Sequence, residues 1–410
     1  MKQLCVRLLG NQVGTLIQND IGTLDFIYID EAKRNLSISM PLQQKLFSNR
    51  QCRPYFEGLL PESDVVRNLL GKRYGISAHN IFSLLEAVGH DCAGAVSFHQ
   101  MDEEIVSTDS YILDGREIDI EELKKIIIDL PKRPLFTDID GLRLSLAGVQ
   151  DKAALCYEDG KFIIPHNLCP TTHIIKTAIP DIKDSIFNEY ACLKIAKAIG
   201  LSACQVEIVN LDEIEFLLIE RYDRTRIDGK IMRLHQEDFC QALAILPGNK
   251  YENEAGPSAT MCFKLVDNSF SPAKDKITFL KYFIYNTLIG NKDAHGKNYS
   301  FLYDHNYHPN ISPLYDVLCT DIYPTLAKKM AMKIGGKYIL NDVYDRHWKS
   351  FTEDLNISYS QLKKLISTMA DQIKLHLNSP TFEIQTKNRE MWENLRNHIT
   401  KNIDTTIKRI

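Results

Sequence analysis

Residues 289–300 (IGNKDAHGKNYS), followed at 314–316 by LYD, contain the pattern that decides how this chain folds and acts. Asp293 precedes Asn298 by five positions (298 − 293), and a predicted β-hairpin with a turn-rich connection comes next. A second carboxylate, Asp316, follows that hairpin directly. The order Asp, Asn, hairpin, Asp therefore predicts three oxygen-bearing side chains on one loop and the hairpin that continues it.

This order matches the arrangement used for phosphoryl transfer. In protein kinases one Asp orients the attacking hydroxyl, an Asn five residues later holds a metal ion, and a third ligand arrives after a hairpin. The pattern predicts that Asp293 is the catalytic residue and that Asn298 and Asp316 bind Mg²⁺, which prefers oxygen ligands and nucleotide phosphates. There is no HRD motif, and Tyr315 to Val317 replace DFG, so the letters differ from those of ordinary eukaryotic kinases. The alternative is a polar loop that caps a helix.

Composition indicates a soluble globular chain. Its 410 residues permit two or three domains, and 44% hydrophobic with 25% charged residues is close to the average for such proteins. The net charge of −4 gives no support for a chain-wide nucleic-acid or membrane-binding surface. No apolar run reaches the roughly 18 residues that a membrane helix needs, and the N-terminus does not resemble a secretion signal. We expect a cytoplasmic protein with no membrane association.

The cysteines and histidines show no metal-ligand spacing. Ten cysteines are scattered singly without a CxxC pair, and the twelve histidines form neither HxxxH nor HExxH. This distribution favours reduced, buried thiols and argues against a disulfide framework or a zinc site.

The hydrophobic pattern predicts an α+β protein with a two-lobed, kinase-like fold. A small α+β unit is expected at residues 1–100, with a connecting segment at 101–138. A strand-rich small lobe follows at 139–222, and a mostly helical large lobe occupies 223–410. The predicted catalytic loop falls in the helical lobe.

Upstream residues supply candidates for nucleotide binding. Lys176 ends the apolar strand-like run that begins at His173, where a kinase carries the lysine that neutralises phosphates. Glu189, on a predicted helix at 186–200, is a candidate ion-pair partner for it. The loop at 145–152 (SLAGVQDK) lies between two predicted strands, where backbone N–H groups could cradle phosphates. The alternatives are a lysine solvated at a sheet edge and a plain hairpin turn.

Residues 217–224 (LLIERYDR) end a strand at the predicted lobe junction. Kinases read adenine with backbone groups at such a junction, and the alternative is a linker held by salt bridges.

Taken together, these motifs resemble the HipA family of bacterial toxin serine/threonine kinases. The resemblance is carried by LAGVQDK at 146–152, HIIK at 173–176, NEY at 188–190, ERYDR at 220–224, HQEDFCQ at 235–241, GNKDAHGKNYS at 290–300 and YDV at 315–317. FEGLLPE at 56–62 and GAV at 94–96 resemble the family's N-terminal region. The resemblance thus spans nearly the whole chain, in the family's order.

The resemblance implies an ATP- and magnesium-dependent protein kinase and assigns its residues. Asp293 would be catalytic, and Asn298 and Asp316 would hold magnesium. The residues implied in nucleotide binding are Ala147, Gly148, Val149, Gln150, Asp151, Lys152, Lys176, Glu220, Arg221, Tyr222 and His295. Ser145 matches the serine that these kinases phosphorylate in themselves, and a phosphate beside the phosphate-binding loop would repel ATP.

The resemblance also implies partners. Family members inhibit growth by phosphorylating a translation component, of which glutamyl-tRNA synthetase is the known type, and a small DNA-binding antitoxin, HipB, neutralises them. DNA would be contacted mainly through that partner, because the chain shows no helix-turn-helix of its own. Asp151 stands where the family more usually has Glu, and the segment at 177–185 is short, which leaves the substrate open. The alternatives are a kinase for a different protein, a small molecule or a lipid, and a non-catalytic kinase-fold binding module.

Overall fold

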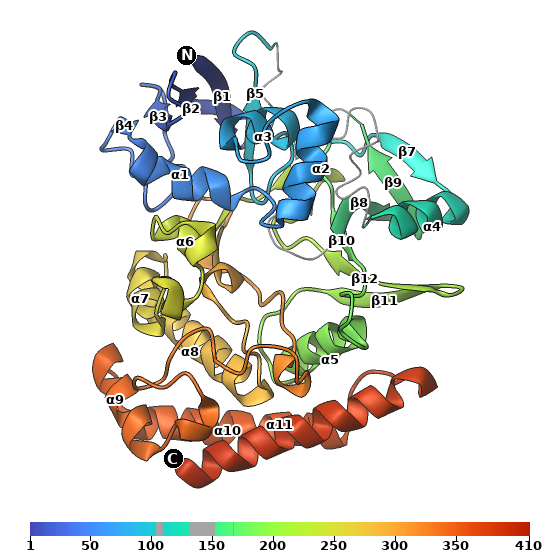
Figure 1. Ribbon diagram of the computed structural model, residues 1–410, viewed down its shortest axis with the longest axis vertical. Helices are drawn as coiled ribbons and strands as arrows, with labels where there is room; N and C mark the ends of the chain where they lie inside the picture. The colour runs from blue at the N-terminus through green and yellow to red at the C-terminus, as the bar shows by residue number, and fades with distance from the viewer. Residues whose placement is uncertain (104–107, 109, 131–151, 167) are drawn as a thin grey trace. The chain divides into compact units, whose positions relative to one another are not determined.

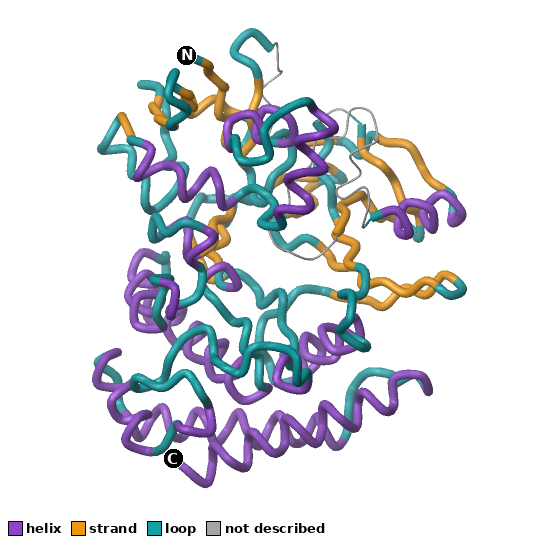
Figure 2. The backbone as a smooth tube through the Cα atoms, viewed as in Figure 1, coloured by secondary structure: helices purple, strands orange, loops and turns teal. Residues whose placement is uncertain are grey.

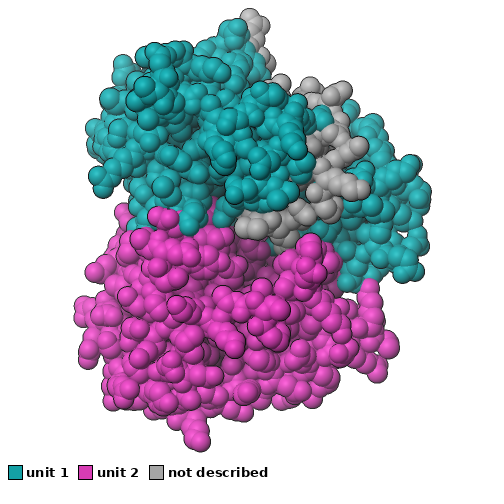
Figure 3. Space-filling model, viewed as in Figure 1, with its two compact units in different colours: residues 1–177, 209–248, 301–309 teal, residues 178–208, 249–300, 310–410 magenta. Residues whose placement is uncertain are grey.

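A computed structural model describes residues 1–103, 108, 110–130, 152–166 and 168–410. Ser145 and five of the predicted loop residues (Ala147, Gly148, Val149, Gln150 and Asp151) lie outside the described residues. The chain divides into two compact units (Figure 3). Unit 1 comprises residues 1–177, 209–248 and 301–309, and unit 2 comprises residues 178–208, 249–300 and 310–410. The four predicted segments remain a prediction.

Unit 1 begins with an antiparallel sheet in the order β4-β3-β2-β1-β5. Its strands are β1 (Lys2–Leu8), β2 (Asn11–Gln18), β3 (Leu24–Tyr28), β4 (Leu46–Phe47) and β5 (Val96–His99). Helices α1 (Asn49–Gly58), α2 (Asp64–Tyr74) and α3 (Ile81–Val88) connect β4 to β5, and α1 packs against β3 (Figure 1). Helix α1 begins at Asn49, where the N-cap residue Ser48 and Gln51 in the first turn form a capping box, and Pro54 lies inside the helix.

The second sheet of the chain carries Lys152 and Lys176. Its order is β11-β12-β10-β8-β9-β7. The strands are β7 (Gly115–Ile118), β8 (Lys152–Glu158), β9 (Lys161–Pro165), β10 (His173–Lys176), β11 (Val206–Leu211) and β12 (Ile214–Glu220). Helix α4 (Ile120–Asp129) starts at Asp119, whose side chain accepts the Glu122 N–H at 2.8 Å.

One apolar core connects the two sheets within unit 1. It contains Phe26 and Phe56 from the N-terminal segment together with Ala153, Ile175 and Phe216 from the second sheet. Residues 1–100 are therefore packed onto the second sheet through shared side chains, rather than around a separate core.

Two small three-stranded sheets and a short helix complete the strand-rich part. One has the order β13 (Arg224–Ile227), β14 (Lys230–Arg233), β6 (Ser110–Tyr111), and the other β15 (Gln236–Asp238), β16 (Ser300–Tyr303), β17 (Pro309–Ile311). Helix α6 (Phe239–Ala242) follows β15 and packs against α1. Strands β16 and β17 confirm the predicted hairpin after Asn298.

Unit 2 is mostly helical, whereas strands predominate in unit 1 (Figure 2). Its helices are α5 (Ser185–Ala198), α7 (Ala259–Leu265), α8 (Pro272–Ile289), α9 (Asp345–Leu355), α10 (Tyr359–Asn378) and α11 (Arg389–Arg409). Helix α11 packs against α8 and α10. Among the described residues, no helix combines the length and apolar character needed to cross a bilayer. The predicted α+β class is confirmed.

Candidate active site

The predicted catalytic loop leaves helix α8 through a glycine that no other residue could replace without strain. Gly290 has φ +79°, and its N–H donates to the carbonyls of Asn286 and Thr287. A Cβ at this position would lie 2.7 Å from Asn402 Nδ2 and 3.0 Å from Asp321 Cβ. Both the backbone conformation and the close packing therefore require glycine, and together they set the direction in which the loop begins.

Hydrogen bonds within the loop hold Asp293 in place. The Asp293 N–H donates to Asn291 Oδ1 at 3.0 Å, and Asn291 Nδ2 in turn donates to Asn286 Oδ1 at 2.8 Å. Asn291 is buried at 5% exposure, whereas 52% of the Asp293 side chain is exposed. The loop thus has a buried polar base and presents the Asp293 carboxylate outward.

Asn298 is tied back to Asp293 by its side chain. Its Nδ2 donates to the Asp293 carbonyl at 2.8 Å, and its own N–H donates to the His295 carbonyl at 2.9 Å. These bonds close the five-residue spacing into a compact turn that ends in a short 3₁₀ helix (Gly296–Asn298). With Nδ2 engaged, the Asn298 side-chain oxygen is the atom left for a cation.

His295 is near Asp293, and its pKa is affected by the charge of Asp316. Its Nε2 is 3.9 Å from Asp293 Oδ1, and the Asp316 charge acts on its ring. Burial lowers the pKa of His295 well below its usual value, and Lys250 and Lys297 lower it further against the opposing effect of Asp316. The imidazole is therefore neutral at physiological pH. Its Nδ1 is buried without a hydrogen-bond partner among the described residues.

Asp316 follows the hairpin in a left-handed backbone conformation, with φ +56°. Such a φ is uncommon outside glycine and is tolerated by Asp. The preceding Tyr315 hydroxyl donates to the Lys297 carbonyl at 2.6 Å and lies 2.5 Å from Ser300 Oγ. These contacts join the segment that carries Asp316, which follows β17, to the loop that carries Asn298.

A second set of contacts, made by residues 320 and 321, supports the start of the loop. The Lys292 N–H donates to Thr320 Oγ1 at 2.7 Å, and Lys292 Nζ is 3.4 Å from Asp321 Oδ2. Although burial raises the pKa of Asp321, His398, Lys292 and Asn402 lower it to about 2. Asp321 is therefore charged at neutral pH, and it holds the buried Lys292 ammonium beside the start of the loop.

The two predicted phosphate-binding lysines are opposite each other on neighbouring strands of unit 1. Lys152 begins β8 and Lys176 ends β10, and they are paired in the antiparallel register. Lys176 is buried at 7% exposure. Two cations at the same end of adjacent strands concentrate positive charge there. Glu189 is buried on α5 of unit 2, and its pairing with Lys176 remains a prediction.

Glu220, Arg221 and Tyr222 have different environments. Glu220 is exposed at the end of β12, opposite His173. The Arg221 N–H donates to the Thr172 carbonyl at 2.9 Å, and the Tyr222 hydroxyl donates to Gln236 Oε1. The role of these three residues in adenine binding remains a prediction.

The Arg221 side chain belongs to a buried ion-pair network. Its members are Asp91, Arg221, Asp223, Arg224 and Arg233, all buried within unit 1. Arg221 Nη2 donates to Asp223 Oδ2 at 2.8 Å, and Arg224 Nη2 donates to Asp91 Oδ1 at 2.8 Å. The Arg221 guanidinium therefore stabilises the fold through ion pairs. This agrees with the alternative interpretation of residues 217–224 as a linker held by salt bridges.

The structure thus brings together Asp293, His295, Asn298 and Asp316 in unit 2, and Lys152 with Lys176 in unit 1. Sequence reasoning missed Tyr251, whose hydroxyl donates to Asp293 Oδ1 and whose ring meets that of His295 at 5.1 Å and 86°. Tyr251 lies 42 residues before Asp293, so no local pattern pointed to it.

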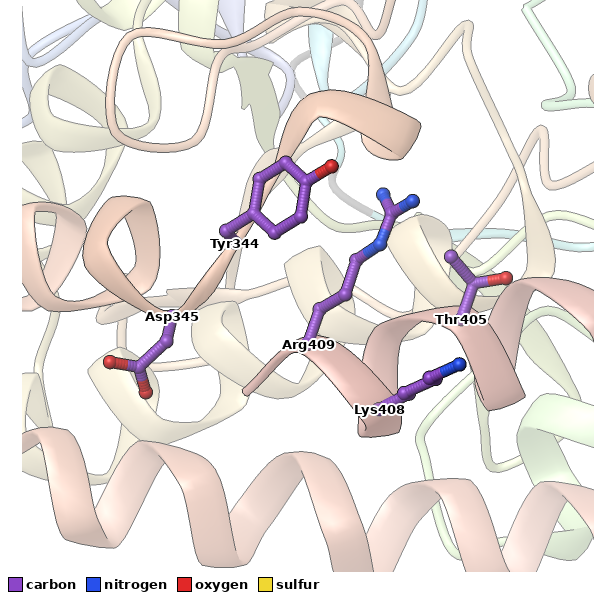
Figure 4. Close-up of a pocket in the computed structure, with 5 residues that line it drawn as sticks. All are labelled: Tyr344, Asp345, Thr405, Lys408 and Arg409. Atoms are coloured by element: carbon purple, nitrogen blue, oxygen red, sulfur yellow. The ribbon is translucent and has the colours of Figure 1, made fainter.

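A separate pocket in unit 2 involves none of the predicted site residues. It encloses about 520 Å³ and is lined by Tyr344, Asp345, Thr405, Lys408 and Arg409 (Figure 4). The Arg409 guanidinium lies over the Tyr344 ring, 4.7 Å from its centroid. None of the residues that line this pocket belongs to the predicted catalytic loop.

Comparison with known proteins gives consistent matches along the chain. A family model described as the HipA N-terminal domain matches residues 4–99, and one described as the HipA-like C-terminal domain matches residues 144–377. The putative kinase Y4mE of Sinorhizobium fredii is 39% identical over 371 residues, which are 88% of each chain. The serine/threonine-protein kinase toxin HipA of Shewanella oneidensis is 31% identical over 352 residues, covering 82% of this chain and 79% of that protein.

The fold agrees with these relationships. A solved structure of the Shewanella oneidensis toxin–antitoxin system, containing HipA, HipB and operator DNA, has a chain that superposes with a TM-score of 0.86 and 26% identity. The superposition covers 99% of this chain and 97% of that one. The expected resemblance is confirmed: the chain belongs to the HipA family and is a serine/threonine-protein kinase.

Proposed function

We propose that this kinase transfers the γ-phosphoryl group of ATP to a serine or threonine hydroxyl of a protein, with Asp293 as the residue that accepts the hydroxyl proton. The observation that carries the proposal is the contrast between the outward-facing Asp293 carboxylate and the buried, hydrogen-bonded loop that holds it. A carboxylate held in this way can orient a hydroxyl for in-line attack.

The donor set of unit 2 fits magnesium. Asn298 presents its amide oxygen because its amide nitrogen is engaged, and Asp316 supplies a carboxylate from the segment after β17 that is joined to the same loop. Oxygen donors of this kind are what Mg²⁺ takes from proteins. When bound with ATP, Mg²⁺ neutralises charge that develops on the phosphates. Neutral His295, whose buried Nδ1 has no hydrogen-bond partner among the described residues, can hydrogen-bond the nucleotide without adding charge.

The lysines of unit 1 fit the triphosphate. We propose that Lys152 and Lys176 bind phosphate oxygens, together with backbone N–H groups of residues 147–151, and that Glu220 to Tyr222 line the adenine. The paired positions of the two lysines support this assignment, because phosphate binding requires concentrated positive charge.

We further propose that the kinase is the toxin of a toxin–antitoxin pair. The Shewanella oneidensis relative is named as a kinase toxin, and its solved complex contains HipB and DNA. By analogy, this chain would inhibit growth by phosphorylating a translation component such as glutamyl-tRNA synthetase, and a HipB-like antitoxin would neutralise it. Autophosphorylation at Ser145 would switch the kinase off by placing charge beside the ATP phosphates.

Quantitative phosphoproteomics after brief induction tests the activity and names the substrate together. Wild type should yield at least one new phosphoserine or phosphothreonine on a translation protein and one on Ser145, and Asp293→Asn should yield neither. Label that appears only on a small molecule or lipid would favour a different kinase. No transfer from γ-labelled ATP with Mg²⁺ would indicate a non-catalytic binding module.

The proposed self-inactivation by phosphorylation of Ser145 can be tested separately. Ser145→Ala should remain active over a time course in which wild type loses activity. Phosphopeptide mapping that finds no phosphate on Ser145 of the wild type would remove the self-inactivation step while leaving the kinase assignment intact.

A further inference from the structure

Three side chains of types that ligate metals meet in the N-terminal part of unit 1, outside the predicted kinase site. His90 lies in the turn after α3, His99 is the last residue of β5, and Glu103 lies in the turn that follows. One ligand atom of each lies within 4.8 Å of the others. The two histidines are nine positions apart (99 − 90), which is not the spacing of a short helical metal motif. They come together because the chain turns back between α3 and β5.

One separation between the ligand atoms suits a small divalent cation. His99 Nδ1 and Glu103 Oε2 are 3.5 Å apart. In a tetrahedral zinc site with bonds of about 2.0–2.2 Å, neighbouring ligand atoms are about 3.3–3.6 Å apart. The His99–Glu103 separation therefore matches one edge of such a tetrahedron.

The orientation of His99 is determined by a neighbour. Its Nε2 lies 2.9 Å from Ser97 Oγ on the same strand. When Nε2 carries the hydrogen and donates to Ser97, Nδ1 has the lone pair and points toward Glu103. Ligating histidines almost always donate their other N–H in this manner, because that bond selects the tautomer and fixes the ring.

The third ligand and the access route are also in place. The His90 ring stacks on His99 with centroids 4.9 Å apart and an interplanar angle of 24°, and one of its nitrogens lies within 4.8 Å of the ligand atoms of His99 and Glu103. His99 is 2% exposed, His90 is half-buried and Glu103 is exposed. The ligand set therefore has one buried side and one side open to solvent.

We propose that His90, His99 and Glu103 form a binding site for a divalent transition metal of the zinc class, with water as the fourth ligand. Two imidazoles and one carboxylate favour such metals over magnesium, which prefers oxygen ligands alone. The bound metal would join the turn before β5 to the turn after it. Because β5 is an edge strand of its sheet, this link would stabilise the folded N-terminal sheet. The proposal does not depend on the kinase assignment.

Cobalt(II) titration of the full chain, in excess Mg²⁺ to occupy oxygen-only sites, tests the proposal. Wild type should bind one equivalent with the visible absorption of a tetrahedral nitrogen–oxygen site and no thiolate charge-transfer band. His90→Ala and Glu103→Gln, which change a half-buried and an exposed side chain, should each weaken binding by about tenfold or more. Zinc should raise the melting temperature of wild type and not of His90→Ala.

Two matched variants control for surface binding. Asp102→Asn removes the exposed carboxylate next to Glu103, and His79→Ala removes an exposed histidine, so both should bind cobalt as wild type does. Equal binding by wild type, His90→Ala and Glu103→Gln would overturn the proposal, as would a thiolate band or no binding. In the last case the three residues form only a histidine stack with an ion pair.

Discussion

The buried ion-pair network of unit 1 and the predicted catalytic loop of unit 2 both contain aspartate carboxylates, but these carboxylates have different surroundings. Asp91 and Asp223 are 6% and 4% exposed and each faces two or more arginines. The Asp293 side chain is 52% exposed and accepts a hydrogen bond from the Tyr251 hydroxyl. A buried carboxylate between arginines supports structure, whereas the half-exposed Asp293 carboxylate is the one that we propose orients the substrate hydroxyl.

The largest expected effect is a loss of kinase activity on mutation of the loop of unit 2, with little change in stability. Asp293→Asn should reduce phosphoryl transfer by about 10²–10⁴-fold, because the amide cannot accept the hydroxyl proton. ATP binding and the melting temperature should be nearly unchanged, since the side chain is half exposed. Labelled-ATP assays and calorimetric ATP titration measure both, with the exposed Asp354→Asn as the control. An Asp293→Asn variant as active as wild type would refute the catalytic assignment.

The corresponding change in the network should act on stability. Asp91→Asn leaves Arg224 and Arg233 buried without their shared carboxylate, which should lower the free energy of unfolding by about 3–5 kcal/mol. Urea denaturation followed by circular dichroism measures this loss. The control is Asp30→Asn in the same unit, which removes an exposed carboxylate paired with Lys45 at 2.7 Å and should change stability little. Equal effects from the two variants would contradict the structural role of the network.

A pH-dependent effect is expected at Glu237, which is buried in unit 1. Burial raises its pKa to about 7, although hydrogen bonds from Ser37, Tyr303 and the Ile38 N–H oppose the shift. Because the folded state keeps this proton longer than the unfolded state, the contribution to stability is full below the unfolded pKa of 4.5 and is lost as the pH rises through 7.

Glu237→Gln should therefore become more stable relative to wild type as the pH rises. The difference in unfolding free energy should change by up to about 3 kcal/mol between about pH 5 and 8. Urea denaturation at several pH values measures the slope, with exposed Glu117→Gln as the control. A difference that does not vary with pH would show that Glu237 is ionised in the folded state throughout.

The smallest expected effect concerns how the loop is positioned. Gly290→Ala should destabilise the protein by about 1–2 kcal/mol for its positive φ, plus a cost for the contact with Asn402. Gly200→Ala is the matched control, because its φ is +80° and nothing lies within 4 Å of the added Cβ. Denaturation of both variants separates backbone strain from packing. Kinase activity should fall only in Gly290→Ala, and an equal fall in both would contradict the positioning role.

Sequence reasoning worked where the chemistry was local. The hairpin after Asn298 and the helix predicted at 186–200, which is α5 in the structure, both depend on residues close together in the chain. It failed for contacts between residues that are far apart in the chain. Tyr251 reaches Asp293 across 42 positions, and Arg224 reaches Asp91 across 133 positions.

The sequence by itself determined the α+β class, the family and the order of the predicted site residues, because periodicity, turn residues and motif spacing are encoded along the chain. Only the tertiary structure decided which carboxylates are saturated and which face outward, that Gly290 must be glycine, and that His90, His99 and Glu103 share one place. The physical reason is that burial and pairing depend on side chains brought together by packing, and no local spacing records which distant residues these will be.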